Sequence, residues 1–113
     1  MSIEGIGPNM IANNLKPYIP THPGEVLKDE LEFHGISQRG LAKELGISYS
    51  VLNEVLNGKR PLNTQLAMML EVALGVPAAP LLAMQNEYNM LMAERDKSFM
   101  KKLNNIRRIA AAL

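Results

Sequence analysis

The sequence has no cysteine and no tryptophan, and only 4% of its 113 residues are aromatic. The absence of cysteine excludes disulfide bonds and thiolate metal sites, and it suits a reducing compartment. Because 47% of the residues are hydrophobic, a core is possible, but it has to be built from Leu, Ile, Val, Ala and Met. One domain is expected at this length.

The sequence also lacks a long apolar run, a signal-peptide pattern and a strong charge of one sign. We therefore expect a cytoplasmic protein without a membrane-spanning segment. The net charge is +1, but it is unevenly distributed. Residues 94–113 carry six cations and two acids (+4), and residues 1–93 carry six cations and nine acids (−3). Any nucleic-acid binding must therefore come from a local group of residues, because the protein as a whole has no strong positive electrostatic field.

Residues of catalytic and metal sites are scarce. The two histidines, His22 and His34, are not spaced as a metal-binding pair, and the chain has no glycine-rich phosphate loop or nucleophile elbow. Glu30 lies four residues before His34, a spacing that favours an ion pair over catalysis. We expect no enzymatic activity, no metal and no cofactor.

Cap residues and apolar spacing predict an all-α chain. The first helix is expected to start at a Thr21 cap, to bury Val26, Leu27, Leu31 and Phe33, and to stop at Gly35. No segment alternates with a period of two for long, so no sheet is predicted. A fifth helix is expected after Pro77 or Pro80, and its continuation through the tail is left open. The three helices in between are predicted to start at Ser37, Ser48 and Asn63 and to end at Gly46, Gly58 and Gly75.

Residues 38–60, "QRGLAKELGISYSVLNEVLNGKR", join two of these helices through Gly46. Glycine supplies the positive φ that a short turn between two nearly perpendicular helices needs. Ala42 is small where the helices are expected to touch. The apolar residues fit the same geometry, and the joint pattern is typical of a helix-turn-helix: Leu41, Leu45, Ile47, Leu52 and Val55.

The polar residues that remain outside this core predict a DNA-binding face. Short polar groups and one tyrosine on the second helix suit the reading of base edges in a major groove. A residue at the start of the first helix of this helix-turn-helix can reach a phosphate beside the free N–H groups of that helix end. The polar residues that follow its second helix can hold backbone phosphates. Glu54 is the weakest member, since a carboxylate repels phosphate; it could accept from a cytosine amino group or simply be solvated. The alternative for the whole set is an ordinary solvated surface. The predicted base-reading residues are Ser48, Tyr49, Ser50, Asn53 and Glu54, and the predicted phosphate contacts are Gln38, Asn57, Lys59 and Arg60.

Four stretches, two of which overlap residues 38–60, show a family resemblance over about residues 20–93. They are "HPGEVL" at 22–27, "ISQRGLAKELGIS" at 36–48, "LNGKRPLNTQLA" at 56–67 and "LLAMQNEY" at 81–88. With them the chain resembles the HigA-type antitoxins of the lambda-repressor-like (Xre) helix-turn-helix family. The resemblance implies a five-helix domain, spanning residues 21–93, that dimerises, represses its own promoter and neutralises a small RelE-like mRNA-cleaving toxin. Where the family usually opens its fifth helix with Ser or Thr and an aromatic, this chain has Pro77 and Leu81, so a weaker cap and a later start, near Pro80, are expected.

The two ends of the chain lie outside the resemblance. Residues 1–20 mix Gly, Pro and Asn without periodicity and are expected to form a flexible arm. Residues 94–113 are predicted to form a basic amphipathic helix, with apolar residues at near-helical spacing. Its expected role is packing on the core or on a second subunit; docking to a partner is the next alternative, and a membrane surface the least favoured. The apolar residues of this tail are Phe99, Leu103, Ile106, Ile109 and Ala110.

The eight methionines are expected to fill the core, or to give an adaptable dimer contact through the fifth helix. The function predicted from these features is a homodimeric, DNA-binding antitoxin with operator DNA and a RelE-like toxin as partners. Two alternatives stay open: a stand-alone Xre-type repressor without a toxin, and a protein-interaction module that does not bind DNA.

Overall fold

The computed structural model of the protein describes residues 21–113, which form α-helices and no β-strand. The predicted all-α class is confirmed, but this part of the chain has six helices rather than five, because the C-terminal residues form a helix of their own. The predicted arm, residues 1–20, lies outside the described residues. The helices are α3 (Pro23–His34), α4 (Gln38–Leu45), α5 (Tyr49–Leu56), α6 (Thr64–Leu74), α7 (Ala78–Arg95) and α8 (Lys97–Ala112).

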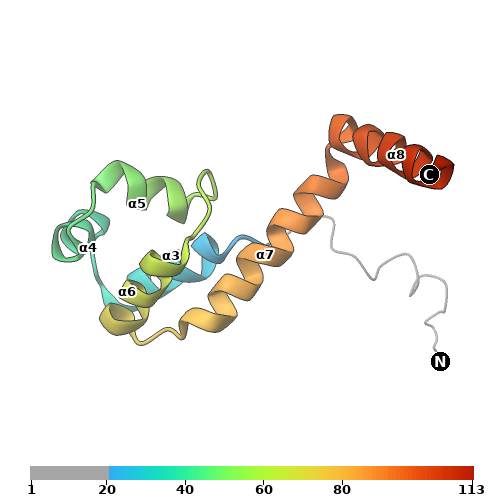
Figure 1. Cartoon of the computed structure of the whole chain (residues 1–113). Helices are drawn as coiled ribbons and strands as arrows, with labels where there is room; N and C mark the ends of the chain where they lie inside the picture. Colours follow the sequence, from blue (N-terminus) through green and yellow to red (C-terminus); the bar gives the residue numbers. More distant parts are fainter. Residues whose placement is uncertain (1–20) are drawn as a thin grey trace, which may run out of the picture.

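Helices α3 to α6 surround one aliphatic core, and α7 packs against it with its first half only (Figure 1). The second half of α7 extends away and carries α8 at its far end, where α8 buries no residue. The radius of gyration is accordingly 18.9 Å, whereas a compact domain of about 100 residues has about 13 Å. Four leucines form the centre of the core: Leu27, Leu52, Leu56 and Leu70.

The predicted caps at the three middle helices are confirmed. The side chains of Ser37, Ser48 and Asn63 each accept a hydrogen bond from a backbone N–H in the first turn, at 3.0, 3.1 and 2.8 Å. Between α4 and α5, Gly46 has a φ of 70°. Residues with a Cβ adopt this backbone conformation only at a cost in free energy. Sequence-local chemistry therefore fixes the ends of these helices.

The prediction that Thr21 caps the first helix is wrong, because His22 takes that position. Its Nδ1 accepts a hydrogen bond of 2.9 Å from the Gly24 N–H, and its ring packs edge-on against Tyr88 with the centroids 4.9 Å apart. A neutral imidazole has an acceptor nitrogen, and His22 directly precedes the proline that opens the helix. Thr21 lies one residue too early and is exposed.

Phe33 is also placed wrongly by the sequence: it is 83% exposed. Leu27 and Leu31 are four residues apart and lie on one buried ridge. Because each residue turns the helix by about 100°, Phe33 points some 160° away from Leu31 and some 120° away from Leu27.

Acid is expected to destabilise the fold through His22. Burial lowers its pKa below the ordinary value of 6.5, although a backbone hydrogen bond with Arg60 and the charge of Glu25 act in the opposite direction. The unfolded chain then binds the proton more readily, so stability is lost as the pH falls through about 6.5. We expect the melting temperature to fall between about pH 7 and pH 5, and to fall less in His22→Asn, which can cap without titrating. Identical pH profiles for the two proteins would contradict this assignment.

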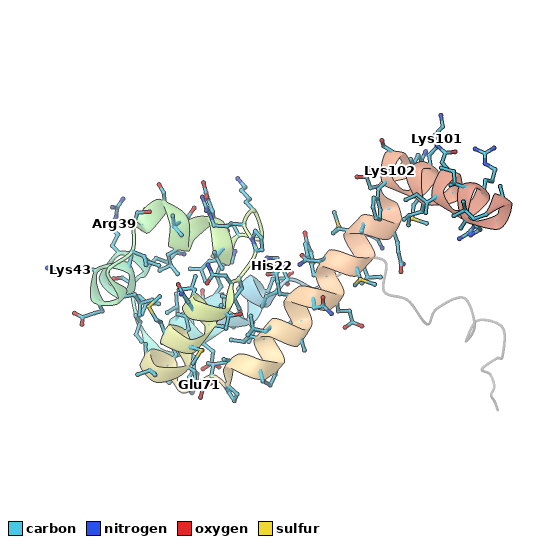
Figure 2. All side chains as sticks on the ribbon, in the orientation of Figure 1. His22, Arg39, Lys43, Glu71, Lys101 and Lys102 are labelled. Atoms are coloured by element: carbon cyan, nitrogen blue, oxygen red, sulfur yellow. The ribbon has the colours of Figure 1, made fainter. Side chains whose placement is uncertain are left out.

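The fifth helix begins directly after Pro77, not near Pro80 as the weak cap suggested. Glu71, near the end of α6, replaces the missing cap: its Oε1 accepts a 2.7 Å hydrogen bond from the Ala78 N–H (Figure 2). Pro80 has no N–H to satisfy and fits the first turn of a helix. The start of α7 is thus stabilised by a side chain from the preceding helix.

Removing this acceptor in Glu71→Ala is expected to lower the free energy of unfolding by about 1 kcal/mol, the typical value of an N-cap. Urea denaturation measures the change. Glu71→Gln keeps an acceptor oxygen at the same reach and is expected to lose less than half as much. Equal stability of Glu71→Ala and the unaltered protein would show that solvent replaces the bond.

The chain breaks between α7 and α8 at Asp96, which settles the question of a continuous helix. Asp96 is extended, with φ −83° and ψ 104°, and its side chain accepts a 3.1 Å hydrogen bond from the Phe99 N–H. It is therefore the N-cap of α8. None of the helices in residues 21–113 has the length and apolar composition required to cross a membrane.

Candidate nucleic-acid interface

Helix α5 is short and two-sided. Leu52, Val55 and Leu56 are buried against the core, while Ser50 is exposed on the opposite side and Tyr49 is exposed at the first position of the helix. Ser48 is exposed as well, but its hydroxyl oxygen already accepts the cap hydrogen bond from the Val51 N–H. Of the two predicted serines, Ser50 therefore has the less committed hydroxyl.

The start of α4 and the middle of α5 meet through two predicted site residues. The Nδ2 of Asn53 donates a 2.9 Å hydrogen bond to the Oε1 of Gln38. This contact joins a predicted phosphate ligand to a predicted base reader. This bond does not use the Gln38 side-chain N–H groups or the Asn53 side-chain oxygen. Together the two amides offer a donor and an acceptor, the combination that suits adenine in a major groove.

Glu54 and Arg60 form an ion pair at the end of α5. The Arg60 Nη2 lies 2.7 Å from the Glu54 Oε1, and its Nε donates to the same oxygen at 2.9 Å. Both side chains are more than 40% exposed, so the pair contributes at most about 1 kcal/mol. Glu54 thus orients Arg60 and offsets part of its charge. Lys59 is exposed and has no such carboxylate partner among the residues that the structure describes.

Arg39, which the sequence reasoning missed, extends this face. Its guanidinium carbon lies 4.2 Å from the centroid of the Tyr49 ring, a distance typical of a cation–π contact. Figure 2 shows Arg39 and Lys43 on the outer side of α4. The signal in the sequence was its place directly after Gln38, in the first turn of the same helix.

Lys28 on α3 is a second missed cation. Its Nζ donates a 3.0 Å hydrogen bond to the Oδ1 of Asn57, whose Nδ2 donates to the Asn53 backbone oxygen at 2.9 Å. Asn57 is therefore held between α3 and α5. Because Lys28 and Asn57 are 29 residues apart, no local pattern could have paired them.

The arrangement is a polar helix face with cations around it. Such a face can contact base edges through its short side chains and phosphates through its cations. Within the described part of the chain, no three His, Cys, Asp or Glu side chains gather where they could hold a metal ion. The four cations at its border are Lys28, Arg39, Lys59 and Arg60.

Known proteins are similar to this chain in sequence and fold. A model of the helix-turn-helix family matches residues 27–81. The virulence-associated protein I of Dichelobacter nodosus is 40% identical over 77 residues, which cover 67% of this chain and 71% of that protein.

Two solved structures are similar to this chain, and the similarity covers most of each of them. An addiction module antidote protein of a HigA family from Coxiella burnetii is 33% identical with a TM-score of 0.64, covering 77% of this chain and 94% of that one. Protein PA4674 of Pseudomonas aeruginosa, in complex with its 18-base-pair operator DNA, is 32% identical with a TM-score of 0.60, covering 66% and 81%.

Proposed function

Because this chain belongs to the HigA family of helix-turn-helix proteins, we propose that it is an antitoxin that binds operator DNA and represses its own promoter. The observation that carries the DNA half is the outward face of α5. There the amides of Gln38 and Asn53 are bonded to each other, and cations border them on several sides. We propose that this chain acts by binding rather than by catalysis.

The second half of the proposal is neutralisation of a small RelE-like mRNA-cleaving toxin. It is supported by the similarity to a protein described as an addiction module antidote. The proposed active form is a homodimer, because two recognition helices about one DNA turn apart match an operator with two half-sites.

Lys59→Ala is expected to weaken binding to all DNA sequences alike. A phosphate contact carries no sequence information, and its loss lowers the slope of log K against log salt by about 1. Arg60→Ala is expected to change the slope less, since Glu54 already offsets the charge of Arg60. Fluorescence anisotropy with operator and scrambled duplexes, over a salt series, measures both. An unchanged slope for Lys59→Ala would contradict the phosphate contact.

The toxin half is tested by co-expression with the adjacent small open reading frame. The neighbour expressed alone is expected to stop growth, and this chain is expected to restore growth and to co-purify with it. A harmless or unbound neighbour would remove the toxin from the proposal. The chain would then be a stand-alone repressor, which the anisotropy measurement tests independently.

A further inference from the structure

Helix α8 is a basic helix whose apolar side is largely exposed in the part of the chain that the structure describes. Residues 97–113 contain five Lys or Arg and no acidic residue, so their charge is +5. None of the helix is buried, and Ile106 is 51% exposed. Figure 1 shows α8 at the far end of α7, away from α3 to α6.

The two faces of α8 differ in composition. Phe99, Leu103, Ile106 and Ala110 follow each other at spacings of four, three and four residues, so they line one face. Lys102 and Arg107 flank this stripe, because each lies three or four residues from two of its members. Lys101 and Arg108 have no member of the stripe at these spacings. Their neighbours there are Lys97, Ser98, Asn104, Asn105, Ala111 and Ala112.

A groove of opposite charge lies beside α3. It has a volume of about 780 Å³, with Glu25, Asp29, Glu32 and one cation, Lys28, along the α3 side and the apolar groups of Ile36 and Tyr88 among its lining. Gln38 and Asn57 of the candidate interface line it as well. The three acids and the one lysine of this lining give it a net charge of −2. Within residues 21–113 these three carboxylates of the groove form no ion pair, whereas Glu30, on another side of α3, pairs with His34.

We propose that α8 of one copy lies in the α3 groove of a second copy, and that the reciprocal exchange holds the dimer together. The proposal rests on the dimer of the proposed function and names its surface. The charges of +5 on α8 and −2 on the groove lining are complementary. The two helices are of similar length, about 24 Å for the 16 residues of α8 and about 18 Å for the 12 residues of α3.

Symmetry explains why a second copy fits better than α8 against α8. Two α8 helices side by side would bring like charges of +5 together. In an exchange with two-fold symmetry, the α8–α3 contact occurs twice, which doubles the area buried by one helix face. The exposed second half of α7, with Met90 and Met92, would cross between the two copies.

Charge reversal on full-length chains tests the surface by sedimentation equilibrium. Lys102→Glu with Arg107→Glu is expected to raise the dimer Kd at least tenfold. The matched control, Lys101→Glu with Arg108→Glu, changes the charge equally on the polar face and is expected to change Kd by less than about threefold. On the α3 side of the contact, Asp29→Lys with Glu32→Lys is expected to raise the dimer Kd at least tenfold. The control Glu30→Lys lies outside the groove and is not expected to raise Kd to this extent. Circular dichroism verifies that each variant is folded.

The combined variant decides the pairing. A chain with both reversals, on α8 and on α3, is expected to recover a Kd within about threefold of the unaltered protein, because the complementary charges are exchanged. If the unaltered chain is monomeric, the dimer itself fails. If it is a dimer that binds operator DNA but ignores the α8 or the α3 reversal, only the α8–α3 surface is overturned and the proposed function stands.

Discussion

Gly24→Ala is expected to lower the free energy of unfolding by about 3 kcal/mol, at the upper end of what overpacking costs. A Cβ at this position would lie 2.3 Å from the Val55 backbone oxygen and 2.8 Å from that of Leu56. Both oxygens belong to the last turn of α5 and cannot rotate away as a side chain would. The start of α3 would have to separate from α5.

Thermal unfolding measures this effect, and a melting temperature more than about 10 °C lower is expected for a domain of this size. Gly40→Ala is the matched control, since it is also a glycine in the first turn of a helix. There a Cβ meets only the Ser37 hydroxyl, at 2.9 Å. The gain in helix propensity offsets that crowding, so a change below about 1 kcal/mol is expected. Equal stability of Gly24→Ala and Gly40→Ala would show that the two helices can separate freely.

The stretch "HPGEVL" shows what the sequence alone could and could not give. Val26 and Leu27 were predicted to lie on the apolar face of the first helix, but His22 and Gly24 marked the family resemblance without a physical reason. The structure supplies one: His22 caps α3, Pro23 is fully buried in its first turn, and Gly24 allows the close approach to α5. The reason involves residues some thirty positions away, and no local pattern contains it.

At the other helix ends, too, short-range contacts could be predicted from the sequence and long-range contacts could not. Ser37, Ser48 and Asn63 were predictable because a cap acts on N–H groups two or three residues away. Glu71, which supports α7 from the preceding helix, was not. Gln85 was also missed: it is 5% exposed, and its Oε1 accepts a 2.8 Å hydrogen bond from the Leu62 N–H, 23 residues earlier.

In the candidate interface, helical periodicity predicted which side of α5 faces outward, because its buried stripe is regular. It did not predict the partners of the polar groups. The contacts of Lys28 with Asn57 and of Arg39 with Tyr49 depend on how three helices cross. Glu54, the weakest predicted base reader, has a specific place as the partner of Arg60.

Asn53→Ala is expected to weaken operator binding about tenfold to a hundredfold, the value of about 1–3 kcal/mol for a good base contact. Binding to a scrambled duplex is expected to change little, so the preference for the operator loosens. Ser50→Ala, which removes one exposed hydroxyl at the start of the same helix, is expected to have a smaller effect of the same kind. Anisotropy titrations with both duplexes at one salt concentration measure the ratio.

The contact between Asn53 and Gln38 adds a sharper expectation. If their hydrogen bond orients both amides on the DNA, the loss in the double variant Gln38→Ala, Asn53→Ala will be smaller than the sum of the single losses, by about 0.5 kcal/mol or more. Strict additivity would mean that the two residues contact DNA independently. A loss shared equally by operator and scrambled DNA would mean that Asn53 holds the backbone of the duplex rather than a base, and α5 would then position the protein without reading the sequence at that point.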